Sequence, residues 1–278
     1  MTHSITEKRK IFHALHADGC FVMPNPWDLG SAHALAQLGF KALASTSAGL
    51  CWSQAKPDGG LDLEQTLAHL RQLVACSELP INADFESGFA LTPDELHANV
   101  QRAVATGVAG LSIEDSTGNP DAPLRPLDEA VERLQAARAA IDDSGSGVLL
   151  TGRAENFFVG RPDLDDCLQR LQAYAAAGAD CLYAPGIRTS EQIRAVLDAV
   201  APKPVNVLIG WDSELSVADL ARLGVRRISI GGALARTAWH GFLQAARQIA
   251  EQGSFAGLAA GTPAAELNAL FADRKQQT

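Results

Sequence analysis

Two acidic residues stand two positions apart at the end of an apolar run in the segment PINADFESGFA, residues 80–90. Alternate residues of a β-strand point to the same face, so Asp84 and Glu86 are predicted to share one side of a strand end. Gly88 follows at once, and glycine permits the sharp turn that would end such a strand. The spacing therefore predicts two carboxylates directed into one place.

Polar residues also follow apolar runs elsewhere in the chain. Glu114 and Asp115 end the run GLSIED, Arg153 and Glu155 lie two positions apart in VLLTGRAE, and Asn206 lies within PVNVLIG. The carboxyl ends of parallel strands meet at one face of a barrel or one edge of a sheet. These side chains are therefore predicted to lie close to the acidic pair.

A small, polar segment, STSAGL, follows another apolar run and contains Thr46, Ser47 and Ala48. We interpret it as a flexible loop whose backbone N–H groups could hold a carboxylate. This loop would supply the anion-binding part of the same site.

Carboxylates from separate strands cannot lie together in ionised form without a cation or bound protons. Oxygen ligands without His or Cys suit Mg²⁺ or Mn²⁺, and Arg153 adds positive charge where an anionic intermediate would form. The pattern therefore predicts a divalent metal site. The alternative is a structural role, in which such residues cap helices or pair with arginines. The structural role is preferred for Asp115, and both roles stay open for Glu155 and Asn206.

Short apolar runs alternate with amphipathic helical patterns such as 127–143 and 163–178. The segments LGFKAL, TGVAGL, AGADCL and LGVRRI each show a helix end, a glycine and then a strand. An α/β fold with a parallel (β/α)8 TIM-type barrel is predicted over a doubly wound sheet, because no GxGxxG follows a strand. The predicted strands are 20–25, 41–46, 80–86, 110–115, 148–155, 181–186, 204–210 and 226–232.

The chain of 278 residues is predicted to form one domain, 1–278, because no Pro-, Gly- or Ser-rich linker divides it. The segment 233–278 is helical in pattern and exceeds what a barrel needs. We expect this extension to cover the barrel or to pack on a neighbouring subunit.

Composition excludes several other classes of protein. The net charge of −9 argues against nucleic-acid binding, and no apolar run is long enough for a membrane span. The N-terminus reads as an amphipathic helix without the apolar core of a signal, so a cytoplasmic location is expected. Five scattered cysteines without CxxC predict neither disulfides nor a zinc site.

Four segments, taken in chain order, resemble the isocitrate lyase/phosphoenolpyruvate mutase superfamily. NADFESGFA is similar to its D-x-[DE]-x-G-[FY] motif, and GVAGLSIED to its next strand. GRAENFFVG resembles its arginine strand, and FVMPNPWDLGSAHALAQLGFKALASTSAGL its N-terminal region. The likeness extends from about residue 10 to residue 240.

The resemblance implies a Mg²⁺-dependent barrel that acts on 2-oxo acids through an enolate-like state. It also implies a homotetramer, a dimer of dimers, with swapped C-terminal helices. Carried over residue by residue, the resemblance implies that Asp84 binds the metal directly and that Asp58, Glu86 and Glu114 hold metal-bound waters. It implies that Arg153 stabilises the enolate oxygen, and that the substrate carboxylate is bound by Thr46, Ser47 and Ala48.

The chain departs from this pattern after Glu114. The K-K-C-G-H loop of isocitrate and methylisocitrate lyases is absent from 116–126, and so is the Lys- and Asn-containing loop of the phosphonate branch. Without these loops, the site could still chelate a 2-oxo acid and stabilise its enolate, as in oxaloacetate decarboxylation or cleavage of a substituted malate. A C–P bond enzyme and a non-catalytic 2-oxo acid binding protein are the alternatives.

Some roles stay open at this level. Cleavage of a malate needs a general base, for which Glu155, Tyr183 and Glu86 are unranked candidates; the histidines are expected to be structural or exposed. Asn206 and Glu155 are candidate substrate contacts. Aromatic residues that would either line a pocket or pack in the core are Trp52, Phe89, Phe157, Tyr183 and Trp211.

Overall fold

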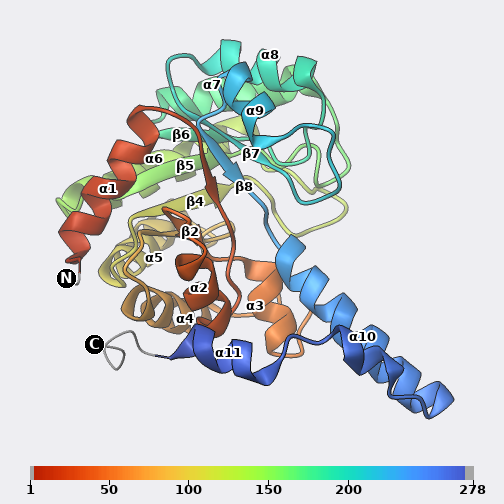
Figure 1. The fold of residues 1–278 in the computed structure, drawn as a ribbon. Coiled ribbons are helices and arrows are strands. Elements are labelled where there is room, and N and C mark those ends of the chain that lie inside the picture. Colours follow the sequence, from red (N-terminus) through yellow and green to blue (C-terminus); the bar gives the residue numbers. More distant parts are fainter. Residues whose placement is uncertain (1–2, 273–278) are drawn as a thin grey trace.

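The structure, a computed structural model, describes residues 3–272 and contains an eight-stranded parallel barrel (Figure 1). The strand order is β1-β8-β7-β6-β5-β4-β3-β2, and the amide of Ala44 donates to the carbonyl of Pro24 across the remaining gap. The predicted (β/α)8 barrel is confirmed, and each strand falls inside its predicted range. The strands are β1 Phe21–Met23, β2 Leu43–Ala44, β3 Ile81–Asp84, β4 Gly110–Glu114, β5 Leu149–Arg153, β6 Cys181–Tyr183, β7 Val205–Leu208 and β8 Arg227–Ser229.

Helices surround the strands. Six of them begin with a capping box, in which the N-cap side chain and the third helical residue exchange hydrogen bonds with each other's backbone. The helices of the barrel are α1 Ile5–Ala17, α2 Leu29–Gln37, α3 Ser47–Ser53, α4 Leu63–Cys76, α5 Pro93–Ala105, α6 Leu127–Asp143, α7 Leu164–Ala176, α8 Ser190–Val200 and α9 Val217–Leu223.

Local signals in the sequence place several helix ends correctly. Helix α6 has the predicted bounds, and Asp163 caps α7 by accepting from the amide of Asp166. The glycine of each repeated segment has a positive φ: Gly39 at 86°, Gly107 at 94°, Gly178 at 101° and Gly224 at 100°. A left-handed residue stops the helix and turns the chain into the next strand, so the repeat is a structural one.

Helix α1 covers the N-terminal ends of the strands. Phe12 is fully buried there against Phe21 and Leu149, and Arg9 donates to the carbonyl of Val108 just before β4. The bottom of the barrel is therefore closed by apolar packing. Polar residues gather at the opposite, C-terminal face.

The C-terminal segment is helical, as predicted, over the described part: α10 Ala233–Gln252, a 3₁₀ turn at Ala256–Ala260, and α11 Ala264–Phe271. Helix α10 extends away from the barrel, and α11 returns to α2, where His33 Nε2 lies 3.1 Å from the carbonyl of Leu270 (Figure 1). The last part of the predicted extension, 273–278, lies outside the described residues. None of the helices within 3–272 is long and apolar enough to cross a membrane.

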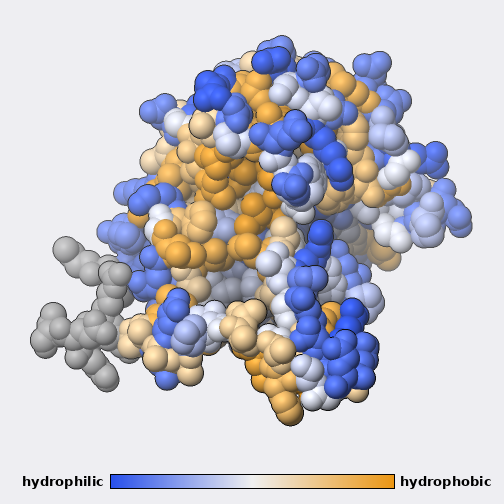
Figure 2. Space-filling view, turned by 45° about the vertical axis from the view of Figure 1, so that its right-hand side comes forward, coloured by the Kyte–Doolittle hydropathy of each residue, from blue (hydrophilic) through white to orange (hydrophobic). Residues whose placement is uncertain are grey.

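Exposed apolar side chains concentrate on this segment. Figure 2 shows hydrophobic residues along the lower edge of the molecule, at the height of α10 and α11 in Figure 1. The ring centroids of Trp239 and Phe242 lie 5.5 Å apart on α10. The exposed apolar residues of the segment are Trp239, Phe242, Leu243, Ile249, Phe255, Leu258, Leu267 and Phe271.

His69 of α4 gives the fold a pH-dependent stability. Its side chain is buried, its Nε2 has no hydrogen-bond partner within residues 3–272, and burial lowers its pKa to about 4. Unfolded His69 takes up a proton near pH 6.5, but the folded form does so only near pH 4. The free energy of unfolding should therefore fall by about 3 kcal/mol more in wild type than in His69→Leu as pH drops through this window.

Urea unfolding between pH 7 and pH 4 measures this difference. Leu73→Ala is the control, because it removes buried apolar volume from the same helix but no titratable group, so it should lower the stability and keep the wild-type pH slope. Parallel pH slopes in wild type and His69→Leu would contradict the assignment.

Candidate active site

Arg153 joins three carboxylates at the C-terminal ends of neighbouring strands. Its Nη1 lies 3.2 Å from Oδ1 of Asp84 and 3.2 Å from Oε2 of Glu114, and its Nε pairs with Glu155. Asp84, Glu114 and Arg153 are the last residues of β3, β4 and β5. The guanidinium also lies 5.2 Å from the centroid of the Tyr183 ring. The structure thus brings the predicted strand-end residues together.

Asp84 links this cluster to the segment after β2. Its Oδ2 accepts from the amide of Ser47 at 2.9 Å, and its own amide donates to the hydroxyl of Ser45 at 2.8 Å. The prediction of a flexible loop here is wrong, because Thr46 caps α3 by accepting from the amide of Gly49. The three predicted carboxylate-binding residues therefore lie at a helix N-terminus rather than in a mobile loop.

Glu86 reaches the cluster in a different way from that predicted. Strand β3 ends at Asp84, so strand alternation does not direct Glu86; a tight turn does, closed by the 2.8 Å hydrogen bond from the amide of Gly88 to the carbonyl of Phe85. Glu86 has a φ of 48°, a strained conformation for a residue with a side chain. A Cβ on Gly88 would lie 2.0 Å from Leu96, so glycine is required there.

The cluster carries more negative charge than Arg153 can balance. Burial, followed by the charges of Asp84 and Asp58, raises the pKa of Glu86 to about 7. Burial also raises the pKa of Glu114 well above its usual value and that of Glu155 above its usual value, although Arg153 opposes both shifts. The cluster therefore favours bound protons or an added cation.

Burial alone would lower the pKa of Arg153, but the charges of Glu155 and Glu114 outweigh it and raise the pKa well above the usual value. The guanidinium is therefore a permanent cation at the centre of the cluster. Burial raises the pKa of Tyr183 to about 12, so its hydroxyl stays protonated.

Asp115 has a structural role. Its carboxylate accepts from Nη1 of Arg170 at 3.1 Å, from the hydroxyl of Tyr174 at 2.6 Å and from the amide of Glu155 at 2.8 Å. These partners include another arginine than Arg153, and the bond to the amide of Glu155 fixes the backbone that carries Glu155. The preferred interpretation of Asp115 as a paired, structural acid is confirmed.

A cavity of about 520 Å³, here named the barrel cavity, opens at this face. It reaches between the strands, since Met23 and Asn206 line it together with Ser112. Asn206 is buried and held there by Ser229 and Arg227, each at 2.9 Å, so it is both packed and directed into the cavity. The predicted site residues that line the cavity are Thr46, Ser47, Ala48, Asp58, Asp84, Arg153 and Asn206; Glu86, Glu114 and Glu155 are not among the lining residues.

Of the aromatic candidates, Trp52, Tyr183 and Trp211 line the barrel cavity, whereas Phe89 and Phe157 pack against the core. The neighbouring Phe158 lines the cavity instead of Phe157. The distinction depends on which side of a loop each ring faces, and no sequence pattern reports it.

Several lining residues were not predicted. Asn25 and Asn82 follow or occupy strands, and Oδ1 of Asn82 is buried without a hydrogen-bond partner in the described residues. Arg227 extends into the barrel and donates to Thr151 at 3.0 Å. Polar residues within short apolar strands were the available signal, since a barrel interior rarely holds an unpaired amide or guanidinium without a use for it.

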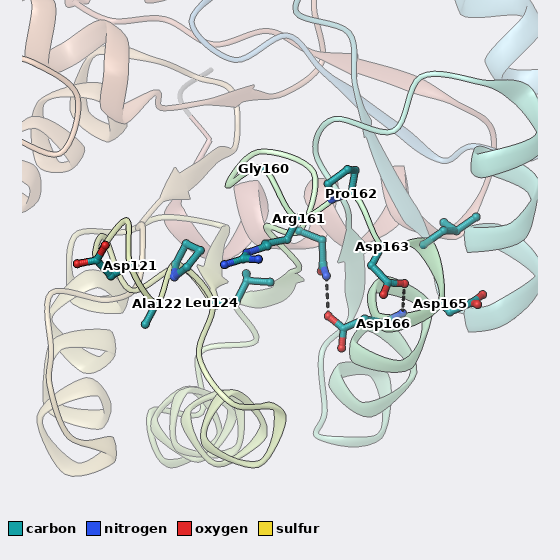
Figure 3. Close-up of a pocket in the computed structure, with 12 residues that line it drawn as sticks. Asp121, Ala122, Leu124, Gly160, Arg161, Pro162, Asp163, Asp165 and Asp166 are labelled. Atoms are coloured by element: carbon teal, nitrogen blue, oxygen red, sulfur yellow. Dashed lines mark hydrogen bonds between the residues drawn. The ribbon is translucent and has the colours of Figure 1, made fainter.

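A second hollow of about 920 Å³ lies between the loop after β4 and the loop after β5. Figure 3 shows Asp121 and Leu124 on one side, Asp163, Asp165 and Asp166 on the other, and the side chain of Arg161 between them. The side chain of Asn156 donates to Asp166 at 2.6 Å in its wall. None of the carboxylates around Arg153 lines this hollow, so it is separate from the candidate site.

The donor set fits a divalent cation held mainly through water. Within residues 3–272 no three His, Cys, Asp or Glu side chains are grouped closely enough to hold one ion directly. Asp84 and Asp58 nevertheless line the same cavity, and loss of solvent and the charge of Asp84 raise the pKa of Asp58. One direct carboxylate with further acids binding coordinated waters is the usual arrangement for Mg²⁺.

The fold and the site together define a barrel protein with an acidic, arginine-centred site at the C-terminal face. Residues 12–250 match the phosphoenolpyruvate phosphomutase family, and the chain belongs to that family. It is thereby a member of the phosphoenolpyruvate mutase/isocitrate lyase superfamily, and the resemblance read from the sequence is confirmed.

The descriptions of similar proteins support the conclusion that this chain is an enzyme. A Burkholderia cenocepacia J2315 structure, provisionally described as a lyase/mutase, is 44% identical, with a TM-score of 0.94 over 98% of this chain and 99% of that one. Oxaloacetate decarboxylase of Paraburkholderia xenovorans is 30% identical over 80% of this chain and 74% of its own. An uncharacterised protein of Mycobacterium tuberculosis H37Rv is 31% identical over 96% and 98%.

Proposed function

We propose that this chain is a Mg²⁺- or Mn²⁺-dependent lyase or decarboxylase acting on a small 2-oxo or 2-hydroxy dicarboxylic acid. The observation that carries the proposal is the position of Arg153 at the barrel cavity, where this one guanidinium pairs with three carboxylates, Asp84, Glu114 and Glu155. The decarboxylases at about 30% identity support the reaction type.

The chain's own residues would position the substrate and stabilise its charge. Asp84 would hold the cation directly, with Asp58, Glu86 and Glu114 binding its waters. When bound, the cation supplies an electron sink beside the carbonyl group. The N-terminus of α3, at Ser47 and Ala48, would bind the carboxylate next to that carbonyl, since helix N-termini favour anions.

Arg153 would stabilise the enolate oxygen that develops during the reaction. In oxaloacetate the bond that breaks joins the carboxylate beta to the carbonyl group to the neighbouring CH2 carbon. Carbon dioxide leaves, and the electron pair of that bond passes into the enolate. Arg153 contacts Asp84 at the strand ends, so the position of its positive charge is fixed before the reaction begins. A proton from water then gives pyruvate, and no side-chain acid is required.

The loop 116–126 supports decarboxylation over the cleavage of isocitrate-like acids, because it contains no cysteine, histidine or lysine. Cys51 does not replace the missing acid: it is buried between Leu50 and Leu61, and burial raises the pKa of its thiol. Cleavage of a substituted malate would require Glu155, Tyr183 or Glu86 as the base. Phosphonate C–P cleavage and non-catalytic binding are the competing functions.

A proton NMR time course with Mg²⁺, with and without EDTA, separates these functions. The panel is oxaloacetate, 2,3-dimethylmalate, methylisocitrate and phosphonopyruvate, each with a no-enzyme sample that records metal-catalysed decay. Metal-dependent turnover of oxaloacetate or dimethylmalate supports the proposal. Phosphate release from phosphonopyruvate alone, or binding of 2-oxo acids without any product, would replace it.

We further propose that α10 packs on another copy of this chain in a homo-oligomer. The protruding helix exposes Trp239, Phe242 and Leu243, and a row of apolar side chains of this kind is typical of an interface. Light scattering should give a tetramer for wild type and a smaller species for Phe242→Glu. Exposed Gln252→Glu on the same helix is the control, and a wild-type monomer would contradict the proposal.

A further inference from the structure

The barrel cavity has an outer part that the proposed chemistry does not use. Arg188 follows β6, Trp211 follows β7, and Arg236 lies in the first turns of α10; all three line the cavity beyond the strand ends. A cavity of about 520 Å³ falls within the range of about 300–1,000 Å³ typical of drug-sized ligands. An acid as small as oxaloacetate would leave this outer part empty.

The two outer arginines have no acidic partner. Neither Arg188 nor Arg236 lies within 4.0 Å of a carboxylate oxygen in residues 3–272. The acids that line the cavity are Asp58 and Asp84, both assigned above to the inner, metal-binding part. The outer part therefore has a net positive charge, whereas the charges that line the inner part, Asp58, Asp84, Arg153 and Arg227, balance.

The outer cations lie beside an aromatic ring and at a helix start. The guanidinium of Arg188 lies 4.4 Å from the centroid of the Trp211 ring, a stacking distance that orients its N–H groups. Arg236 belongs to the first turns of α10, whose Gly232 and Ala233 also line the cavity. That helix start has no capping side chain and no acid in its first turn, so its partial positive charge adds to that of Arg236.

Aromatic side chains line the cavity near these cations. Trp52, Phe158 and Trp211 all line it, and a Cβ added to Gly232 would lie 3.1 Å from the Trp52 ring. Such a wall suits an apolar arm, and the two guanidinium groups suit a carboxylate at its end.

We propose that the outer part of the barrel cavity binds a second carboxylate of the substrate, carried on an extended apolar arm, between Arg188 and Arg236. This inference rests on the proposed function, because the inner part must hold the 2-oxo acid group. Within the proposed substrate class it favours 2-oxo or 2-hydroxy acids whose second carboxylate lies on a longer arm than that of oxaloacetate.

Calorimetric titration in the presence of Mg²⁺ tests the inference without requiring turnover. The probes are 2-oxoadipate and 2-oxohexanoate, which share the 2-oxo acid group and an arm of similar length but differ in the distal carboxylate. Wild type should bind 2-oxoadipate at least about tenfold more tightly. This preference should fall to within about twofold in Arg188→Gln and in Arg236→Gln, with the affinity for 2-oxohexanoate unchanged.

Arg222→Gln is the matched control, because Arg222 is an exposed arginine on α9 outside the cavity lining. It should keep the wild-type preference, and an equal loss in this variant would overturn the inference by showing a general charge effect. Equal binding of the two acids by wild type would overturn the inference alone. If neither acid nor oxalate binds with Mg²⁺ present, both the inference and the proposed function fail.

Discussion

Replacing Asp84 with asparagine is expected to lower the metal-dependent turnover of oxaloacetate by at least about 10³-fold. Removal of one stabilising donor typically costs about 10²–10³ in rate, and Asp84 is proposed to hold the cation on which the whole reaction depends. Asparagine keeps the side-chain shape, and its carbonyl oxygen can still accept from the amide of Ser47, now bound at 2.9 Å. Its NH2 group would then face Nη1 of Arg153, which now lies 3.2 Å from Oδ1 of Asp84, so thermal unfolding is measured alongside to separate the loss of charge from a loss of folding.

The control for this experiment is Asp94→Asn, which removes an exposed acid from the first turn of α5. Its cost should be limited to about 0.3–1 kcal/mol of stability, with turnover unchanged. Initial rates at several Mg²⁺ concentrations provide the measurement. Wild-type, Mg²⁺-dependent rates in Asp84→Asn would show that the cation binds elsewhere.

Replacing Arg153 with glutamine is the second large effect. Its guanidinium is the group placed to stabilise an enolate oxygen, so kcat/KM should fall by about 10²–10³-fold. Arg153→Lys keeps the charge but loses the planar fork that contacts Asp84, Glu114 and Glu155, so it should retain an intermediate rate.

Folding must be measured alongside, because Arg153 also balances buried acids. Breaking a buried pair can cost about 3–5 kcal/mol, so thermal unfolding of each variant is followed by circular dichroism. Rates are then compared at a temperature where both variants are folded. Full activity in folded Arg153→Gln would show that Arg153 has no role in the reaction.

Much of the fold could be predicted because its signals are local. The repeated glycines end helices with positive φ, and α6 begins and ends at the predicted residues, Leu127 and Asp143. These features depend on residues adjacent in sequence, which is why pattern and turn chemistry sufficed. Helix α3 was missed because its small residues resemble a loop, although Thr46 caps the helix by accepting from the amide of Gly49.

The site residues at strand ends could be predicted from the sequence, but those in the turns, loops and helices beyond the strands could not. Asp84, Glu114 and Arg153 end strands, and parallel strands must converge at one face. Glu86 is near Asp84 through a turn with a positive φ that no alternation rule describes. Arg188 and Arg236 come from a loop and a helix whose approach to the cavity depends on tertiary packing.

Calorimetric titration of oxalate tests the central claim most directly, because this planar dianion has the shape and charge of the enolate of pyruvate. We predict that wild type binds oxalate with Mg²⁺ present, and that binding is lost with EDTA or in Asp84→Asn. Oxalate binding that is the same with and without metal, or that survives intact in Asp84→Asn, would contradict a metal-dependent enolate site at Asp84 and Arg153.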